Sequence, residues 1–226
     1  MNKEISNHVL EIRFQPNSRF LDEKGLIASQ IVINTKFDQW NISTNKVEFT
    51  RSDQTGFSAF FSFSNLGVAS NTPATADDFL ITAKEFVKSA WQYFKTDTII
   101  RLGMRSTFLI ETADFTNTFN AYKNKFLKLN DVELKKFDGE LIDVGFPLNF
   151  INGDIFFNVM TGPMQKKQSK NFFEEKAFES GIYVDIDYFK KEVSPHIIQK
   201  HVISFIEDGM AKAKSLARQI FEWTND

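Results

Sequence analysis

Charged side chains alternate along three predicted strands of this 226-residue chain, and they could form one polar surface. Alternation in a strand directs every second side chain to the same face of a sheet. If the three strands lie side by side, the cluster could bind an anionic group through arginine forks, or it could simply decorate a solvated face with ion pairs. The candidate binding residues are Glu11, Arg13, Arg101, Arg105, Asp185 and Asp187.

Two of these residues also raise a metal hypothesis. Asp185 and Asp187 place two carboxylates on one strand face, which is a pattern that can bind Mg²⁺. Asp143 or Asp154 would have to supply a further ligand. A metal-dependent phosphoesterase or nuclease that uses Asp185 and Asp187 is therefore one alternative function. The pattern fixes no third ligand, so we assign no metal site and expect no cofactor.

A complete catalytic pattern is missing from the sequence. The chain has no cysteine, which removes disulfides, thiol nucleophiles and cysteine-bound metals. It contains no G-x-S-x-G, Walker loop or G-x-G-x-x-G segment. The spacing of His196 and His201 differs from the i, i+4 spacing that metal-binding helices favour. We predict no catalytic residues and lean towards a non-enzymatic protein.

The composition limits the class of partner. The net charge of −2 argues against nucleic acid, because phosphate contacts need a basic surplus. The 26 phenylalanines, against 4 tyrosines, indicate a phenylalanine-rich core or, as an alternative, a ligand cavity lined by phenylalanine. The first residues carry no apolar signal region, and no apolar run approaches the ~20 residues of a membrane helix. We expect a cytoplasmic protein without membrane contact.

The elements that must position the charged residues follow an order that repeats. The sequence predicts an α+β fold of two pseudo-repeats, each a strand, a helix, an antiparallel meander and a long helix, with the helices packed on one face of the sheet. We expect a single globular unit with halves 1–96 and 97–226. The first half is predicted to contain strands at 8–15, 37–42, 46–51 and 57–66, and helices at 19–32 and 75–95, with a capping box at Thr75 and Asp78.

The second half carries stronger local signals. Asp114 is the expected cap of a helix over 115–128. Asp138-Gly139 and Asn152-Gly153 both predict tight hairpin turns, because these dipeptides tolerate positive φ. Residues 164–180 are polar and predict a loop with a short helix, which could contact a partner. The remaining predictions are strands at 98–110 and 181–189, and a last helix that begins at Ser194 and Pro195 and allows a neighbouring backbone to approach closely at Gly209. Gly103, in the strand at 98–110, is expected to mark close backbone packing or a bulge.

Three short stretches resemble a known family. LEIRFQPN at 10–17, RLGMR at 101–105 and IYVDIDYF at 182–189 are similar to motifs of a sporadically distributed bacterial protein family of unknown function. Ser106 and Thr107 depart from the aromatic residue and asparagine expected after the central motif. The resemblance implies no catalytic residues, and the family's patchy occurrence is like that of defence, toxin–antitoxin and immunity genes.

A non-enzymatic binding or accessory protein is the leading prediction. It would act through contact with a protein partner or with further copies of itself. The alternatives are the small-ligand binder and the metal-dependent enzyme described above.

Overall fold

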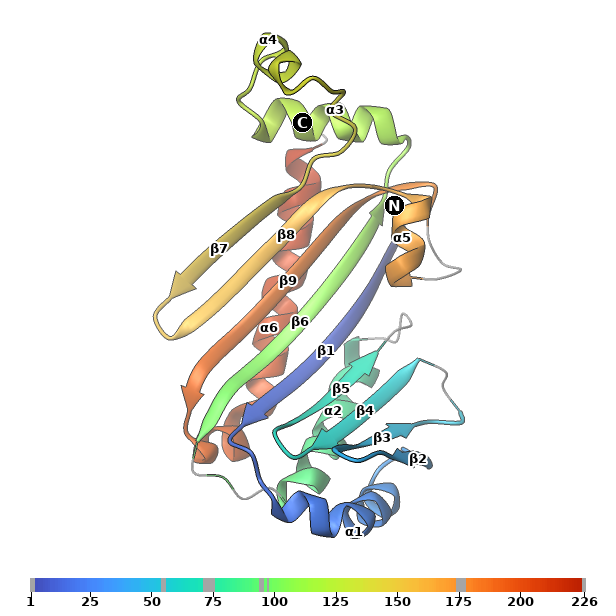
Figure 1. Ribbon diagram of the computed structural model, residues 1–226, viewed down its shortest axis with the longest axis vertical. Helices are drawn as coiled ribbons and strands as arrows, with labels where there is room; N and C mark the ends of the chain where they lie inside the picture. The colour runs from blue at the N-terminus through green and yellow to red at the C-terminus, as the bar shows by residue number, and fades with distance from the viewer. Residues whose placement is uncertain are drawn as a thin grey trace.

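The fold is an α+β arrangement built on one antiparallel sheet (Figure 1). The computed structural model describes residues 3–53, 56–70, 76–93, 96, 98–173 and 178–224. In this part of the chain nine strands form a sheet in the order β2-β3-β4-β5-β1-β6-β9-β8-β7. They are β1 (Glu4–Phe14), β2 (Gln39–Ile42), β3 (Lys46–Thr50), β4 (Phe57–Ser62), β5 (Asn65–Ser70), β6 (Ile99–Glu111), β7 (Phe146–Asn152), β8 (Ile155–Gln165) and β9 (Ser180–Val193).

The helices differ greatly in length, and α6 is the longest of them. In Figure 1 it runs behind the middle of the sheet, where it contacts β6 and β9. None of the helices in the described ranges is long and apolar enough to cross a membrane. The helices are α1 (Arg19–Asn34), α2 (Ala76–Trp91), α3 (Phe115–Phe126), α4 (Asp131–Leu134), α5 (Lys166–Phe173) and α6 (Pro195–Trp223), with a 3₁₀ turn η1 (Lys135–Phe137) after α4.

Alternation along the strands separates a dry face from a charged face. In β1, Leu10, Ile12 and Phe14 are buried and belong to one core cluster. The same cluster contains buried residues of α1, α2 and α6, such as Phe79 of α2 and Ile206 of α6. Because successive strand residues point to opposite faces, the residues between them in β1 lie on the other side of the sheet. The apolar face therefore fixes which side of the sheet carries the charges.

The meander of the first half contains one more strand than predicted. The predicted strand 57–66 is wrong as a single element, because the chain turns after β4 and returns as β5. The Ser62 hydroxyl donates to the backbone oxygen of Asn65 and accepts from the Asn65 amide, which closes this turn. No glycine, proline or Asn-Gly pair marks the turn. Ser62, Ser64 and Asn65 are residue types that favour turns through such side-chain bonds, so the predicted strand 57–66 overlooked a weak turn signal.

The two predicted hairpin turns have opposite outcomes. The hairpin predicted at Asn152-Gly153 exists, but its turn is shifted by one residue. Asn152 pairs with Ile155, so Gly153 and Asp154 form the loop between β7 and β8, and of these Gly153 has a positive φ of 61°. At Asp138-Gly139 the hairpin prediction is wrong, because the preceding residues form α4 and η1 rather than a strand. Asp138 instead adopts a left-handed conformation that ends η1. The tolerance of Asp138 for positive φ, which suggested a hairpin turn, is used here to end a 3₁₀ turn.

Helix boundaries were predicted closely. Asp114 accepts hydrogen bonds from the amides of Thr116 and Asn117, so the predicted cap of α3 is confirmed. The predicted cap Thr75 of α2 lies outside the described residues, and α6 begins at Pro195 as predicted. Gly209 of α6 is closely approached, but by side chains: a Cβ there would lie 3.1 Å from the Cβ of Met104.

Candidate functional site

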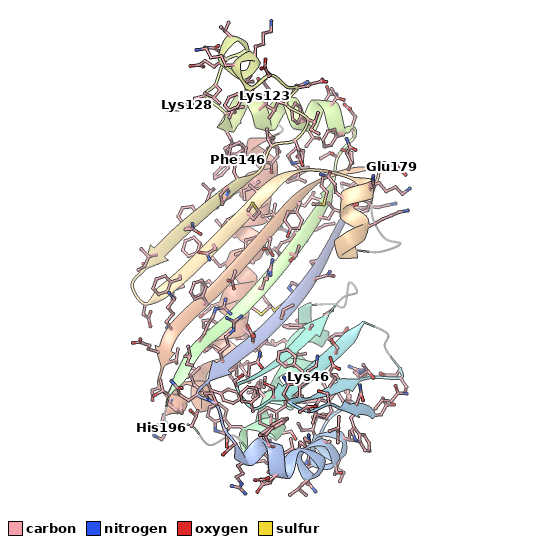
Figure 2. All side chains as sticks on the ribbon, viewed as in Figure 1. Lys46, Lys123, Lys128, Phe146, Glu179 and His196 are labelled. Carbon is pink, nitrogen blue, oxygen red and sulfur yellow. The ribbon has the colours of Figure 1, made fainter. Side chains whose placement is uncertain are left out.

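Three adjacent central strands bring all six predicted site residues to one face. β1 pairs with β6, and β6 pairs with β9. The register sets Arg13 opposite Arg101, and Arg105 opposite Asp187. We call this group the charged cluster: Glu11, Arg13, Arg101, Arg105, Asp185 and Asp187. Figure 2 views the sheet from this side, with α6 behind it.

Arg101 lies at the centre of the charged cluster. Its Nη2 donates to the Asp187 carboxylate on β9, and its Nη1 lies 3.6 Å from Glu11 Oε2 on β1. The guanidinium also lies over the Phe189 ring, 4.6 Å from the ring centroid. Only 16% of the Arg101 side chain is exposed, so this one residue links three strands in a largely water-free position.

Gly103 makes room for that guanidinium. A Cβ at Gly103 would lie 2.2 Å from Nη1 of Arg101. No Cβ contacts of this length occur in real proteins, so the arginine could not keep its position above a larger residue. No bulge lies at Gly103 itself, because it pairs in register with Glu11 of β1 and Phe189 of β9; the register of β1 and β6 shifts nearby, between Arg13 and Phe14. The atoms closest to Gly103 belong to a side chain and not to a neighbouring backbone. The missing side chain at Gly103 leaves space for the guanidinium of Arg101, which belongs to the same strand.

Arg105 and Asp185 form the best-aligned pair of the cluster. Nε and Nη2 of Arg105 each donate to one oxygen of Asp185, both at 2.8 Å, in a two-pronged arrangement. Thr107 Oγ1 donates to the same carboxylate, also at 2.8 Å. The hydrogen bonds to Asp185 raise the pKa of Arg105 above its already high value, against the opposing effect of burial. Arg105 is therefore a permanent, positioned cation.

Glu11 of β1 accepts hydrogen bonds from two neighbouring side chains. Burial by itself raises the pKa of Glu11, but hydrogen bonds from Arg13 and Asn65 and the charges of Arg13 and Arg101 outweigh it. The net pKa of Glu11 is lowered. Arg13 Nε donates to Glu11 at 2.8 Å, and Asn65 Nδ2 donates to it at 3.0 Å from β5. Glu11 thus stays ionised between two guanidinium groups.

Sequence reasoning missed three members of this surface. Thr107 continues the alternation of Arg101 and Arg105, so the pattern along β6 could have found it. Phe189 likewise follows Asp185 and Asp187 on β9. Asn65 was out of reach, because it lies on β5, a strand that was not predicted.

The charged cluster consists of paired opposite charges. The cluster combines three guanidinium groups with three carboxylates, and the Thr107 hydroxyl donates to one of these carboxylates, Asp185. Within the described ranges, no three histidine or acidic side chains come together that could hold a metal ion. The proposed third ligands lie elsewhere: Asp143 accepts from Gln168, and Asp154 accepts from Lys190. Asp185 and Asp187 are themselves already engaged by arginines.

A second polar feature is the buried His8 on the helix side of β1. Its Nδ1 lies 3.0 Å from the Ser106 hydroxyl, and its ring packs at 5.4 Å from that of Phe79. Burial lowers the pKa of His8 to about 4, so the imidazole is neutral at physiological pH. His8 lines an open cavity of about 330 Å³ between β1, β6, α2 and α6. The other lining residues are Glu4, Ser6, Asp77, Leu80, Phe108, Glu207, Met210, Ala211 and Lys214.

Comparison with known proteins adds no relative. A scan against protein-family models and a search of the curated proteins both find no match to this chain. The resemblance to a sporadically distributed bacterial family therefore stays a prediction that rests on the three short motifs.

The role of Gly103 can be tested with a double-mutant cycle. Gly103→Ala should lower the free energy of unfolding by about 1–3 kcal/mol, because the methyl group displaces Arg101 from its partners. In an Arg101→Ala background the same change should cost at least about 1 kcal/mol less. The measurement is urea unfolding of the four proteins. Arg19→Ala, at an exposed ion pair of α1, is the control background in which the cost should not change.

His8 predicts a pH dependence of stability. Its pKa is about 4 in the folded protein against 6.5 in the unfolded chain, so the unfolded state binds the proton more tightly. Stability should therefore fall as the pH decreases from about 6.5 to about 4, by up to about 3 kcal/mol. His8→Asn should lose correspondingly less over this range in urea titrations. Equal losses in both proteins would contradict the assignment, and His196→Asn, at an exposed position, serves as the control.

Proposed function

We propose that this protein is a non-enzymatic binding protein that contacts a protein partner through the charged cluster. One observation carries the proposal: Arg13 and Arg105 are each held by a carboxylate, yet 54% of each side chain stays exposed. A guanidinium that is already oriented loses little conformational freedom when a partner binds. Arginines in this state are frequent energetic centres of protein interfaces.

The balance of charge favours a protein over a polyanion. Three carboxylates lie among the three arginines, so the surface presents both signs within a small area. A nucleic acid would meet the carboxylates as well as the arginines, and the chain as a whole is acidic. Aromatic and cationic groups extend the surface, since Lys191 lies over the rings of Phe156 and Phe189. A partner with mixed charges and acceptors for the two exposed arginines fits best.

We infer further that residues 1–96 and 97–226 are two copies of one layout within a single unit. Supporting this, each half starts with a long strand and a helix, and each continues with an antiparallel meander and a closing helix. In each half the last meander strand pairs with the opening strand: β5 with β1, and β9 with β6. The shared core of α1, α2 and α6 supports packing of these helices on the face opposite the charged cluster.

A bacterial defence, toxin–antitoxin or immunity setting is the context that we propose. It rests on the resemblance to the sporadically distributed family, and it would make the partner another protein of the same system. The metal-dependent alternative gains no support, because arginines hold both Asp185 and Asp187.

The small-ligand alternative has one observation in its favour. The cavity beside His8 has apolar walls from Leu80, Phe108 and Met210, and both nitrogens of the neutral His8 ring are within hydrogen-bond distance of the Ser6 and Ser106 hydroxyls. Its volume of about 330 Å³ lies at the lower end of the range typical of ligand sites. Phe108 is the one phenylalanine among the residues that line it, so it is not the phenylalanine-lined cavity that the composition suggested.

Replacing the exposed arginines tests the proposal. The wild-type chain, used as bait in native extract, should retain a partner that Arg13→Ala/Arg105→Ala loses at least about tenfold. Arg19→Ala is the matched control, because 52% of its side chain is exposed and it also pairs with a carboxylate, but on α1. Quantitative mass spectrometry of the captured proteins gives the ratio. Equal capture by all three baits, or none by the wild type, would contradict the proposal.

A further inference from the structure

Strand β7 forms one of the two edges of the sheet and contains no charged residue. Its seven residues, Phe146 to Asn152, read FPLNFIN. On one side β7 pairs with β8. On its other side no strand of the described ranges pairs with it, as Figure 1 shows at the outer edge of the sheet. The outer backbone groups are therefore available for a further strand.

The side chains of β7 make this edge unusually open to pairing. Ile151 is 67% exposed and Phe150 is 43% exposed. Edge strands are normally protected from association by charged residues, bulges, short length or proline. β7 carries only Pro147, near its start. The opposite edge strand β2 is shorter, with four residues, and contacts α1.

We propose that β7 pairs antiparallel with β7 of a second copy of this chain, about a two-fold axis at Asn149. An axis at the middle residue sets the seven residues of the two strands opposite each other, with Pro147 the one residue that has no N–H to donate, and two-fold symmetry makes the edge complementary to itself. Leu148 then faces Phe150 of the second copy, and Pro147 faces Ile151. No charged residue meets another, because the strand contains none.

The pairing also covers the exposed apolar groups from both sides of the sheet. By strand alternation, Pro147, Asn149 and Ile151 lie on one face, and Leu148 and Phe150 lie on the other. The register through β8 places Asn149 opposite Asn158, which in turn lies opposite Asp187. The dimer would thus carry two charged clusters on one continuous face. The inference does not depend on what those clusters bind.

The oligomeric state in solution tests this proposal. Light scattering coupled to gel filtration should give twice the chain mass of 26.1 kDa for the wild type. Asn149→Lys should weaken dimerisation at least about tenfold, because the two-fold axis sets the two ammonium groups directly opposite each other. Asn41→Lys, an exposed asparagine on the edge strand β2, is the matched control and should remain dimeric.

A charge-swap experiment separates a specific loss of pairing from a folding defect. Asn149→Lys mixed with Asn149→Asp should recover dimers, since opposite charges then meet across the axis. Ile151→Lys is a second variant at an exposed position and should also be monomeric. A monomeric wild type would overturn the proposal. It would likewise be overturned by a dimer that survives both lysine substitutions, by a dimer lost in Asn41→Lys, or by no recovery in the mixture.

Discussion

The antiparallel pairing of β1 with β6 is the constraint on which the rest of the structure depends. These two strands join the first five strands of the sheet to the last four, and they run side by side over nearly their whole length. Their register sets Arg13 directly opposite Arg101, an arrangement of like charges that would be unfavourable by itself. Glu11 and Asp187 compensate for it, because each accepts from one of these arginines or lies beside it. The charged cluster is therefore a consequence of the register and also supports it.

The two faces of the sheet contribute differently to stability and to specificity. On the dry face, fully buried rings such as Phe14, Phe49 and Phe86 each contribute roughly 1.5–3 kcal/mol through burial. Ion pairs on the charged face contribute little net free energy of folding. Removing one partner is nevertheless destabilising, because it leaves the other charge poorly solvated and unpaired. A shift of register by one residue would exchange the faces and bury the arginines. The charges thus specify the pairing more than they strengthen it.

Much of the charged cluster could be predicted because it needs only alternation along three long strands. Glu11 and Arg13, like Asp185 and Asp187, share a face by strand geometry wherever the strands lie in the fold. What alternation cannot supply is strand order, which here places β6 between β1 and β9. Contacts such as Asn65 with Glu11 depend on that order and on a turn with no glycine or proline.

Other failures share a physical cause, namely a local preference that two structures can satisfy. Asp138 and Gly139 tolerate positive φ, and this suits a hairpin turn as well as the end of a 3₁₀ turn. Gly103 permits close backbone packing, yet what lies against it is the guanidinium of Arg101. Alternation along β1 puts His8 on the face of Leu10 and Ile12, but its burial also requires α2 and α6 to cover the start of this strand. For Asp138 and Gly103 the deciding contact is local, with Lys135 and Arg101, whereas for His8 it comes from helices distant in the sequence.

Engineered cysteine pairs measure the register of β1 against β6 most directly, because the chain contains no cysteine of its own. Asn7 lies opposite Thr107 in the structure, whereas Ile5 lies opposite Leu109. A disulfide requires Cα atoms about 4.4–6.8 Å apart, a distance that directly opposed strand residues meet and diagonal neighbours exceed. On mild oxidation, Asn7→Cys/Thr107→Cys should form an internal crosslink, and Ile5→Cys/Thr107→Cys should not. Preferential crosslinking of the second pair would contradict the register and the charged cluster built on it.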